Sequence, residues 1–512
     1  MSKEDKFSTN ALMNVLAWAV SAIAAFVCVP VTVRGLGADA YGLIALIGAL
    51  TGYLGLLDIG LNQALVRYLS FYRELDQGRP MIAIVRVASV WFAGAGIVAA
   101  VALIMSAPWL ARHAFHVAPD LFAGSVTVIR LSAINLVLGL LVSVGMAVPV
   151  SFLRYDIASG ISGVFGVAAY VGPAVLVTMG RGIVAITLFY TASNVLSLLL
   201  YVCVGRHLLG SVKRDIGPGW KDVRRSVLSF AGLIAVNRVG STVAVQTNKL
   251  VLGIANSAAA TAYYQVPDVI TSRAWQLLNR IAGVLFPTSA ALIARKDTEG
   301  LRALYLRSSR LLFLANASIA MPVAVYARPL LQYWVDPTYA EQGALAMMLL
   351  AAAMALNAAA MAVGYISWGA ARAGINLVFA SVGSVITLAA IYPLASRFGV
   401  PGAAAASLAG AFVQPLFVHY VNRRILGISS RMVFRHCYLP TIVGAGLAAT
   451  GSCLVLIRFA DSLPATAVLL VVTALLSVVI SGLLGAITRG EIRQLRDRVL
   501  NMRAGRYRTR RG

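Results

Sequence analysis

Residues Pro464–Ile487 read PATAVLLVVTALLSVVISGLLGAI and contain no charged residue over 24 positions. A helix rises about 1.5 Å per residue, so about 20 apolar residues cross a hydrocarbon core roughly 30 Å thick. The whole chain has a similar composition, because 60% of its 512 residues are hydrophobic and only 12% are charged. Globular soluble proteins carry about 25% charged residues. The sequence therefore predicts an all-α polytopic membrane protein.

Apolar stretches long enough to span a membrane occur fourteen times. The first has no small-residue cleavage site and is too long for a removable signal peptide, so we expect it to stay in the mature protein. We predict about 14 transmembrane helices, at about 11–33, 41–66, 82–106, 121–148, 158–180, 183–205, 226–248, 258–293, 305–327, 342–369, 374–396, 402–422, 437–457 and 464–487.

The basic residues orient these spans. The chain has 43 basic and 18 acidic residues, a formal net charge of +25, but no soluble basic face of the kind that binds nucleic acid. Lys and Arg in short loops are retained in the cytoplasm. With the N-terminus inside, 32 basic residues fall on the cytoplasmic side, 7 on the opposite side and 4 within spans. This distribution predicts that both termini are cytoplasmic.

A weak internal repeat predicts two lobes. RGLGADAYGL (Arg34–Leu43) follows the first span and LVLGIANSAAATAYYQ (Leu250–Gln265) ends the seventh, about 216 to 222 residues later. Both spans run outward, so the repeat is parallel and a substrate site is expected between the lobes. We predict an N-lobe at 1–206, a basic linker at 207–225, a C-lobe at 226–425, two further spans in 426–488, and a basic tail at 489–512 that lies on the anionic inner leaflet.

The sequence lacks the marks of an enzyme. It has no GxxxxGK[ST] phosphate loop, and its external connections are too short to house the acidic site that a membrane glycosyltransferase or polymerase needs. His113 and His116 form an isolated HxxH without further ligands. We therefore expect a transporter with no cofactor and no metal site. The four cysteines are interpreted as small hydrophobic residues, since they lack zinc-type spacing: Cys28, Cys203, Cys437 and Cys453.

Several motifs together resemble the Wzx-type polysaccharide flippases of the multidrug/oligosaccharidyl-lipid/polysaccharide exporter (MOP) superfamily. They are Asn14, Trp18 and Pro30, then RGLGADAYG (Arg34–Gly42), LLDIGLNQALVRY (Leu56–Tyr68), LFPTSAAL (Leu285–Leu292) and LLQYWVDPTYAEQG (Leu330–Gly343). The resemblance implies transfer of undecaprenyl-diphosphate-linked oligosaccharide from the cytoplasmic to the periplasmic leaflet of the bacterial inner membrane, through a cationic cavity between two six-helix lobes. Polysaccharide polymerase and chain-length machinery are the protein partners it implies. Asn248 departs from the family, where an aspartate is frequent.

Four arginines lie within predicted spans and are the candidate diphosphate ligands: Arg130, Arg238, Arg273 and Arg280. Each costs about 2.5–3.5 kcal/mol to insert. Only two acids, Asp58 and Asp268, also lie in spans, so internal pairing can neutralise at most two of the arginines. A planar guanidinium forms bidentate hydrogen bonds to phosphate and keeps its charge when partly desolvated. Four buried cations against two acids therefore indicate an anionic substrate.

Helical geometry groups some of these residues. Arg273, Gln276 and Arg280 share one face of the eighth span, with the two arginines about 10.5 Å apart along the axis, which predicts successive stations for a diphosphate. Arg238 and Lys249 share a face of the seventh span. Asp58 and Asp268 are candidates for orienting an arginine or carrying a proton, and possible sugar contacts are Asn14, Asn62, Gln63, Asn237 and Gln246.

Three alternatives remain open at this point. A peptidoglycan lipid-precursor flippase would move the same undecaprenyl diphosphate carrier. A drug antiporter coupled to cations and resembling the MATE (multidrug and toxic compound extrusion) transporters would need acids in its cavity, and the excess of arginines disfavours it. A membrane glycosyltransferase or polymerase would need an acidic external site, which the short loops disfavour.

Overall fold

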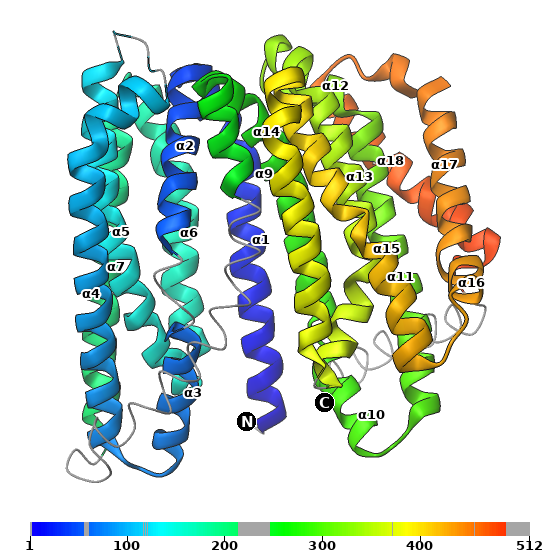
Figure 1. The fold of residues 1–512 in the computed structure, drawn as a ribbon, viewed down its shortest axis with the longest axis horizontal. Coiled ribbons are helices and arrows are strands. Elements are labelled where there is room, and N and C mark those ends of the chain that lie inside the picture. Colours follow the sequence, from blue (N-terminus) through cyan, green and yellow to red (C-terminus); the bar gives the residue numbers. More distant parts are fainter. Residues whose placement is uncertain are drawn as a thin grey trace, which may run out of the picture. The chain divides into compact units, whose positions relative to one another are not determined.

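The computed structural model describes residues 3–55, 61–115, 121–212, 246–370, 372–454 and 456–487, together with Val117 and Pro119. All regular structure in these ranges is helical (Figure 1). The long helices are α1 Lys3–Leu36, α2 Ala38–Leu54, α3 Leu61–Glu74, α4 Gly78–Trp109, α5 Phe122–Ser151, α6 Tyr155–Thr178, α7 Ile183–Gly210, α9 Ala258–Ala282, α10 Leu285–Ala294, α11 Thr298–Val325, α13 Pro337–Gly369, α14 Ala373–Ala411, α17 Leu439–Leu454 and α18 Leu463–Ser481. Shorter helices are α12 Ala327–Trp334, α15 Val413–Val421 and α16 Ser430–Val433.

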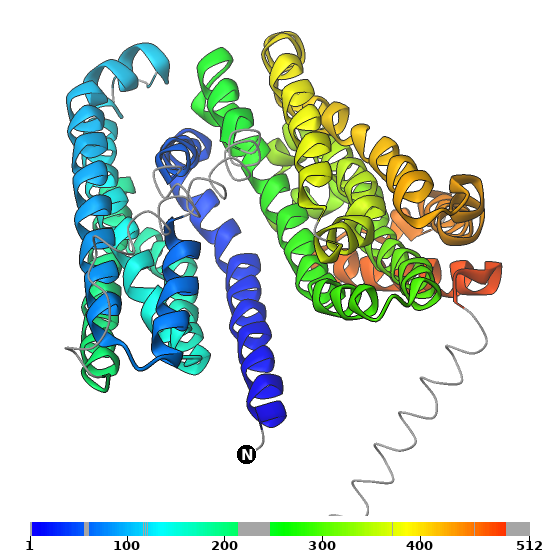
Figure 2. The same cartoon turned by 60° about the horizontal axis from the view of Figure 1, so that its bottom comes forward.

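The helices divide into two compact units. The first comprises residues 1–266 and 387–403, and the second comprises residues 267–386 and 404–512. In the first unit α5 packs against both α4 and α7, and α1 packs against α6 (Figure 1). In the second unit α11 packs on α13 and on the pair α17 and α18, coloured orange to red in Figure 2. The lobe boundary expected at 207–225 stays a prediction, since most of that segment lies outside the described residues.

Within the described ranges, eleven helical segments are long and apolar enough to cross a membrane. Their positions follow the predicted spans closely, as for 183–205, which is found as α7. The continuous segment Gly374–Leu426 covers two predicted spans. It bends at Gly399, where φ is +60° and only glycine fits at low cost. Most of the seventh predicted span, 226–248, and the basic tail lie outside the described residues.

The second predicted span differs from the structure. We expected one helix over 41–66, but α2 ends at Leu54 and α3 begins at Leu61. Glycines at 52, 55 and 60 weaken a continuous helix in this region. From Leu61 the pattern also changes, because Leu61, Leu65 and Leu69 are buried on one face of α3 while Arg67 is exposed on another. An amphipathic helix therefore follows the short apolar one.

Several helices begin at a residue that caps their free N–H groups. Asp336 accepts hydrogen bonds from the backbone N–H of Thr338 at 2.7 Å and of Tyr339 at 3.1 Å, and Pro337 occupies the first turn of α13. Such a cap typically contributes about 1 kcal/mol, and proline in the first turn loses no helical hydrogen bond. The VDPTY part of the family-like motif therefore has a structural role in starting α13.

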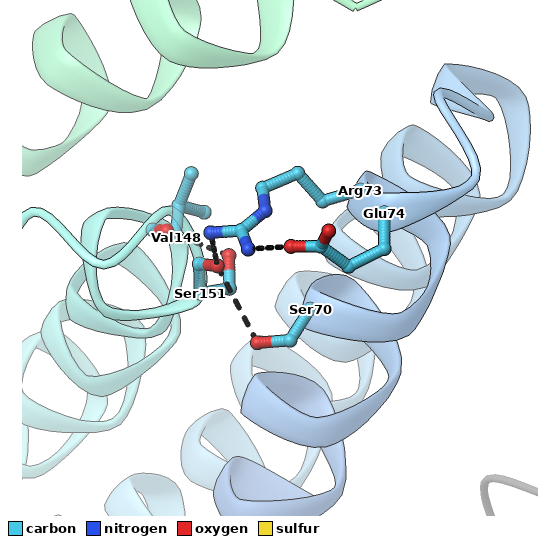
Figure 3. Close-up of polar contacts among 5 residues, drawn as sticks. All are labelled: Ser70, Arg73, Glu74, Val148 and Ser151. Carbon is cyan, nitrogen blue, oxygen red and sulfur yellow. Dashed lines mark hydrogen bonds and ion pairs between the residues drawn. The ribbon is translucent and has the colours of Figure 1, made fainter. Parts of the chain in front are cut away.

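Arg73 fastens the end of α3 to the end of α5 (Figure 3). Its guanidinium donates a hydrogen bond of 2.6 Å to the carbonyl oxygen of Ser151 and also binds the Glu74 carboxylate. The Ser70 hydroxyl donates to the same carbonyl at 3.4 Å, and the Ser151 hydroxyl donates to the Val148 carbonyl at 2.7 Å. The bonds from Arg73 and Ser70 satisfy the carbonyl of Ser151 at the end of α5, whereas the Val148 carbonyl also accepts from the backbone N–H of Phe152 at 3.2 Å.

Candidate substrate-binding site

The first unit encloses two adjoining cavities. The larger has a volume of about 720 Å³ and is walled by α2, α5, α6 and α7. The smaller has a volume of about 290 Å³ and lies among α1, α2, α6, α7, the helical segment 246–255 and the start of α9. Four lining residues are common to both: Ile44, Gly48, Ala169 and Tyr190. The larger volume is within the range of about 300–1,000 Å³ that small-molecule sites occupy.

Glycines on the walls create part of the larger cavity. A Cβ atom added at Gly48, Gly55 or Gly139 would meet no atom within 4 Å. All three line the larger cavity, so a larger residue at each position would project into space that is now open. Glycine inside a helix is less stable than alanine by roughly 0.5–1 kcal/mol. Each of these glycines therefore keeps the space open at some loss of helix stability.

The larger cavity is lined mainly by apolar surface, and the polar groups that the described residues add to it are uncharged. Asn194 on α7 donates its amide N–H to the side-chain oxygen of Asn135 on α5 at 3.2 Å. Tyr190 donates to the carbonyl of Ala169, and Tyr201 donates to the carbonyl of Ala158, both at 3.2 Å. Further hydroxyl groups line the same volume, from Thr51, Ser132, Ser143, Ser162, Thr187, Ser193 and Ser197. Several of these hydroxyl groups, among them Ser143 and Thr187, donate to carbonyls of their own helices. Their oxygen atoms can still accept hydrogen bonds, so a ligand with hydroxyl groups has partners on part of this lining.

The smaller cavity adds a positive charge. Lys249 and Gln246 line it from the helical segment 246–255, and Gln265 lines it from α9. The side-chain oxygen of Gln265 is buried and has no hydrogen-bond partner among the described residues. An unpaired buried acceptor costs about 1–3 kcal/mol, so a ligand hydroxyl or a water that donates to it would be stabilising.

Close backbone packing fixes the position of Lys249. A Cβ atom at Gly42 would overlap the carbonyl oxygen of Ala258, and one at Gly253 would overlap the side chain of Leu46. Thr261 also donates to the Lys249 carbonyl at 3.3 Å. The two segments predicted as repeats, Arg34–Leu43 and Leu250–Gln265, therefore meet through their small residues at Gly42 and Ala258.

Two of the predicted arginines lie on α9 in the second unit. Arg280 and Gln276 are exposed and Arg273 is half-buried. Asp268 lies two turns of helix before Gln276 and is half-buried. This helix is part of the candidate membrane span Ala258–Ala294. The structure thus places Arg273, Gln276 and Arg280 along one short length of a span.

Arg130 points away from the cavities of the first unit. On α5 it is exposed in a stripe with Thr127 and Ile134, whereas Ser132 and Asn135 on another face line the larger cavity. The structure does not bring Arg130 to either cavity, and its role as a diphosphate ligand stays a prediction.

The other predicted contacts are only partly described. Asn62 is half-buried on α3, and Asn248 is buried, with its amide donating to the Tyr264 hydroxyl at 3.2 Å. Asn14 and Gln63 lie in helices, but their side chains are outside the described part. Asp58, Asn237 and Arg238 lie outside the described residues altogether.

Sequence reasoning missed the amide pair of the larger cavity. Asn135 and Asn194 each stand alone in a long apolar stretch, and an amide in a span is unfavourable unless it finds a partner or a wet cavity. That signal was available, but it does not show that the two amides meet. The pairing depends on how α5 packs on α7.

The sequence of this chain is similar to a known protein family and to a curated protein. Residues 7–293 match the polysaccharide biosynthesis protein family. A Shigella flexneri protein named "Putative O-antigen transporter" is 20% identical over 430 residues, which covers 82% of this chain and 98% of that protein.

Solved structures share the fold. An inward-facing multidrug resistance MATE family transporter of the MOP superfamily aligns with a TM-score of 0.69 at 13% identity, covering 81% of this chain and 98% of the other. The lipid II flippase MurJ, in an inward closed conformation, aligns with a TM-score of 0.69 at 10% identity, covering 93% and 98%. The predicted polytopic all-helical fold is confirmed.

Proposed function

The chain belongs to the polysaccharide biosynthesis protein family, and from this we propose that it flips a lipid-linked saccharide across the bacterial inner membrane. It is a transporter of the MOP superfamily, as the sequence resemblance implied. The proposed substrate is undecaprenyl-diphosphate-linked oligosaccharide, a repeat unit of a surface polysaccharide. Movement from the cytoplasmic to the periplasmic leaflet would follow alternating access, with the hydrocarbon tail remaining in the bilayer.

The observation that carries this proposal is the group of cations on α9. Charged side chains inside a span are costly and mark substrate pathways. Arg280 is exposed and Arg273 is half-buried on a helix that is long and apolar enough to span a membrane. A diphosphate passing along this face would accept charge-assisted hydrogen bonds from both guanidinium groups.

The larger cavity of the first unit is proposed to receive saccharide. Asn135 and Asn194 provide amides, and no charged side chain is among the described residues that line it. Sugar hydroxyls exchange hydrogen bonds well with amides, serines and tyrosines. Lys249 in the adjoining cavity provides a cation beside the same wall.

This lining also bears on the alternative functions. A cation-coupled drug antiporter needs acids where its substrate binds, and among the described residues that line the two cavities there is no aspartate or glutamate. A peptidoglycan lipid-precursor flippase remains the second candidate, because the MurJ fold matches over most of this chain and its substrate carries the same class of lipid diphosphate. The two candidates differ in the saccharide that is transported.

The proposal is tested in proteoliposomes with fluorescent lipid-linked saccharide, by following its loss of accessibility to an added glycosidase. The parent should flip the surface-polysaccharide intermediate. Arg273→Ala and Arg280→Ala should each slow flipping by tenfold or more, because a hydrogen bond to a charged group contributes about 1.5–3 kcal/mol and about 1.4 kcal/mol is a factor of ten.

Arg181→Ala is the matched control, since Arg181 is exposed in the turn between α6 and α7, and it should flip at the parental rate. Unchanged flipping in both α9 variants would refute the site. A parent that flips only the peptidoglycan precursor would replace the proposed substrate with the second candidate.

A further inference from the structure

A separate apolar groove lies in the second unit. Its volume is about 580 Å³, and it runs between α15 on one side and the turn Phe434–Tyr438 with α17 on the other. The floor consists of small residues of α13, namely Ala352, Ala355 and Ala359. Phe412, Phe434 and Ile442 line the groove and are 61%, 50% and 45% exposed. The groove therefore opens on the outer surface of the second unit.

One end of the groove is polar. Asn422 lines it and is fully buried, yet neither its amide nitrogen nor its amide oxygen has a hydrogen-bond partner in the described part of the chain. The Tyr305 hydroxyl lies beside it, near enough to interact with the Asn422 side chain. The hydroxyl oxygen of Ser430 is buried and has no hydrogen-bond partner in those ranges. Buried polar groups in native proteins are normally paired, so this end of the groove can take a further polar partner at Ser430 and Asn422.

The same end is strongly basic. Four exposed arginines flank the two polar residues in the chain: Arg423, Arg424, Arg431 and Arg435. None of them forms an ion pair with another described residue. His419 lines the groove, and no carboxylate is among the lining residues in the part of the chain that the structure describes. From Phe412 to Asn422 the chain advances ten residues, so the apolar part is about 15 Å long.

We propose that this groove binds an anionic phospholipid of the membrane. One acyl chain would lie over Ala352, Ala355 and Ala359, and the glycerol and phosphate oxygens would meet Asn422 and Ser430. The flanking arginines would neutralise the headgroup, as basic pockets between membrane helices do for anionic lipids. A neutral lipid would fill the apolar part equally well but would leave these charges uncompensated. The inference does not depend on the proposed substrate.

Native mass spectrometry of the purified, full-length protein tests this proposal. After delipidation, phosphatidylglycerol or phosphatidylcholine of the same acyl composition is added back and the bound fraction is measured. The parent should retain one phosphatidylglycerol at least fivefold more than phosphatidylcholine. Ala355→Leu, which fills the floor of the groove, should lower phosphatidylglycerol retention at least fivefold. Ala102→Leu, at an exposed position of α4, is the matched control and should retain the parental level.

The polar and charged ends are tested separately. Asn422→Leu should weaken retention of both lipids, and the double variant Arg423→Gln, Arg431→Gln should remove the preference for phosphatidylglycerol while folding normally. Equal retention of the two lipids by the parent would overturn the proposal, and so would parental retention by Ala355→Leu. Displacement of the bound phosphatidylglycerol by equimolar undecaprenyl phosphate would also overturn it, because the groove would then be a carrier site.

Discussion

Replacing Gly42 by alanine should destabilise the contact between α2 and the start of α9. A Cβ atom at position 42 would overlap the Ala258 carbonyl oxygen, and would lie 2.5 Å from its carbonyl carbon and 3.3 Å from the backbone nitrogen of Ala259. Ordinary contacts of a Cβ atom are 3.4–4 Å. Backbone atoms cannot rotate away as a side chain can, so the two helices must separate by about 1 Å. Overpacking of this kind costs about 1–3 kcal/mol.

Gly48→Ala provides the control on the same helix, since a Cβ atom there meets nothing within 4 Å. Both variants gain roughly 0.5–1 kcal/mol from the better helix propensity of alanine, so their difference isolates the steric cost of about 1–3 kcal/mol. Thermal unfolding in one detergent and at one scan rate measures it. We expect Gly42→Ala to unfold several degrees below Gly48→Ala. If Gly42→Ala unfolds at the same temperature or higher, the close approach of α2 to Ala258 is wrong.

Two smaller effects test the packing of the first unit. Asn194→Leu should lower the free energy of unfolding by about 0.6 kcal/mol, the typical strength of a hydrogen bond between membrane helices. A double-mutant cycle with Asn135→Leu should give a coupling energy of the same size. A coupling energy of zero would show that the two amides do not form a hydrogen bond. Arg73→Met should lower the free energy of unfolding by about 1.5 kcal/mol, because it removes a charged donor from the Ser151 carbonyl. Glu74→Gln should lower it by less than about 1 kcal/mol, because the Glu74 side chain is 71% exposed. Chemical denaturation of both variants measures the difference, and a larger loss in Glu74→Gln would refute this ranking.

The spans could be predicted because the membrane imposes them. Backbone groups in hydrocarbon must be satisfied within the segment, so a long apolar run has few alternatives to a helix. For this reason 464–487 and 183–205 match α18 and α7 within a few residues. The end of α2 at Leu54 was missed because hydropathy continues past it. Glycine spacing and the change to an amphipathic pattern at Leu61 indicate it better than average hydrophobicity does.

The site was harder to predict, since the presence of a charged residue in a predicted span does not show whether its side chain faces a cavity. Arg130 and Asn135 are five residues apart on α5, which corresponds to about 140° around the helix, and only Asn135 lines the cavity. The cavity itself depends on packing, because Gly48 on α2 and Gly139 on α5 both line it and leave open the space that a side chain would enter. A sequence shows such glycines but not what lies opposite them.

The polar groups described in the lining of the larger cavity are all uncharged, and this has a consequence for stereochemistry. A charged group attracts any opposite charge at a distance, but an amide such as Asn194 forms a strong hydrogen bond only with a partner that lies along its hydrogen-bond directions. With saccharide in this cavity, an epimer that turns one hydroxyl from equatorial to axial would leave an amide unpaired, and unpaired polar groups produce the steepest discrimination between analogues. Exchanging asparagine, serine and threonine among positions such as Ser132, Asn135 and Ser193 would then retune the transporter to a different sugar while its helices and its charge stay the same.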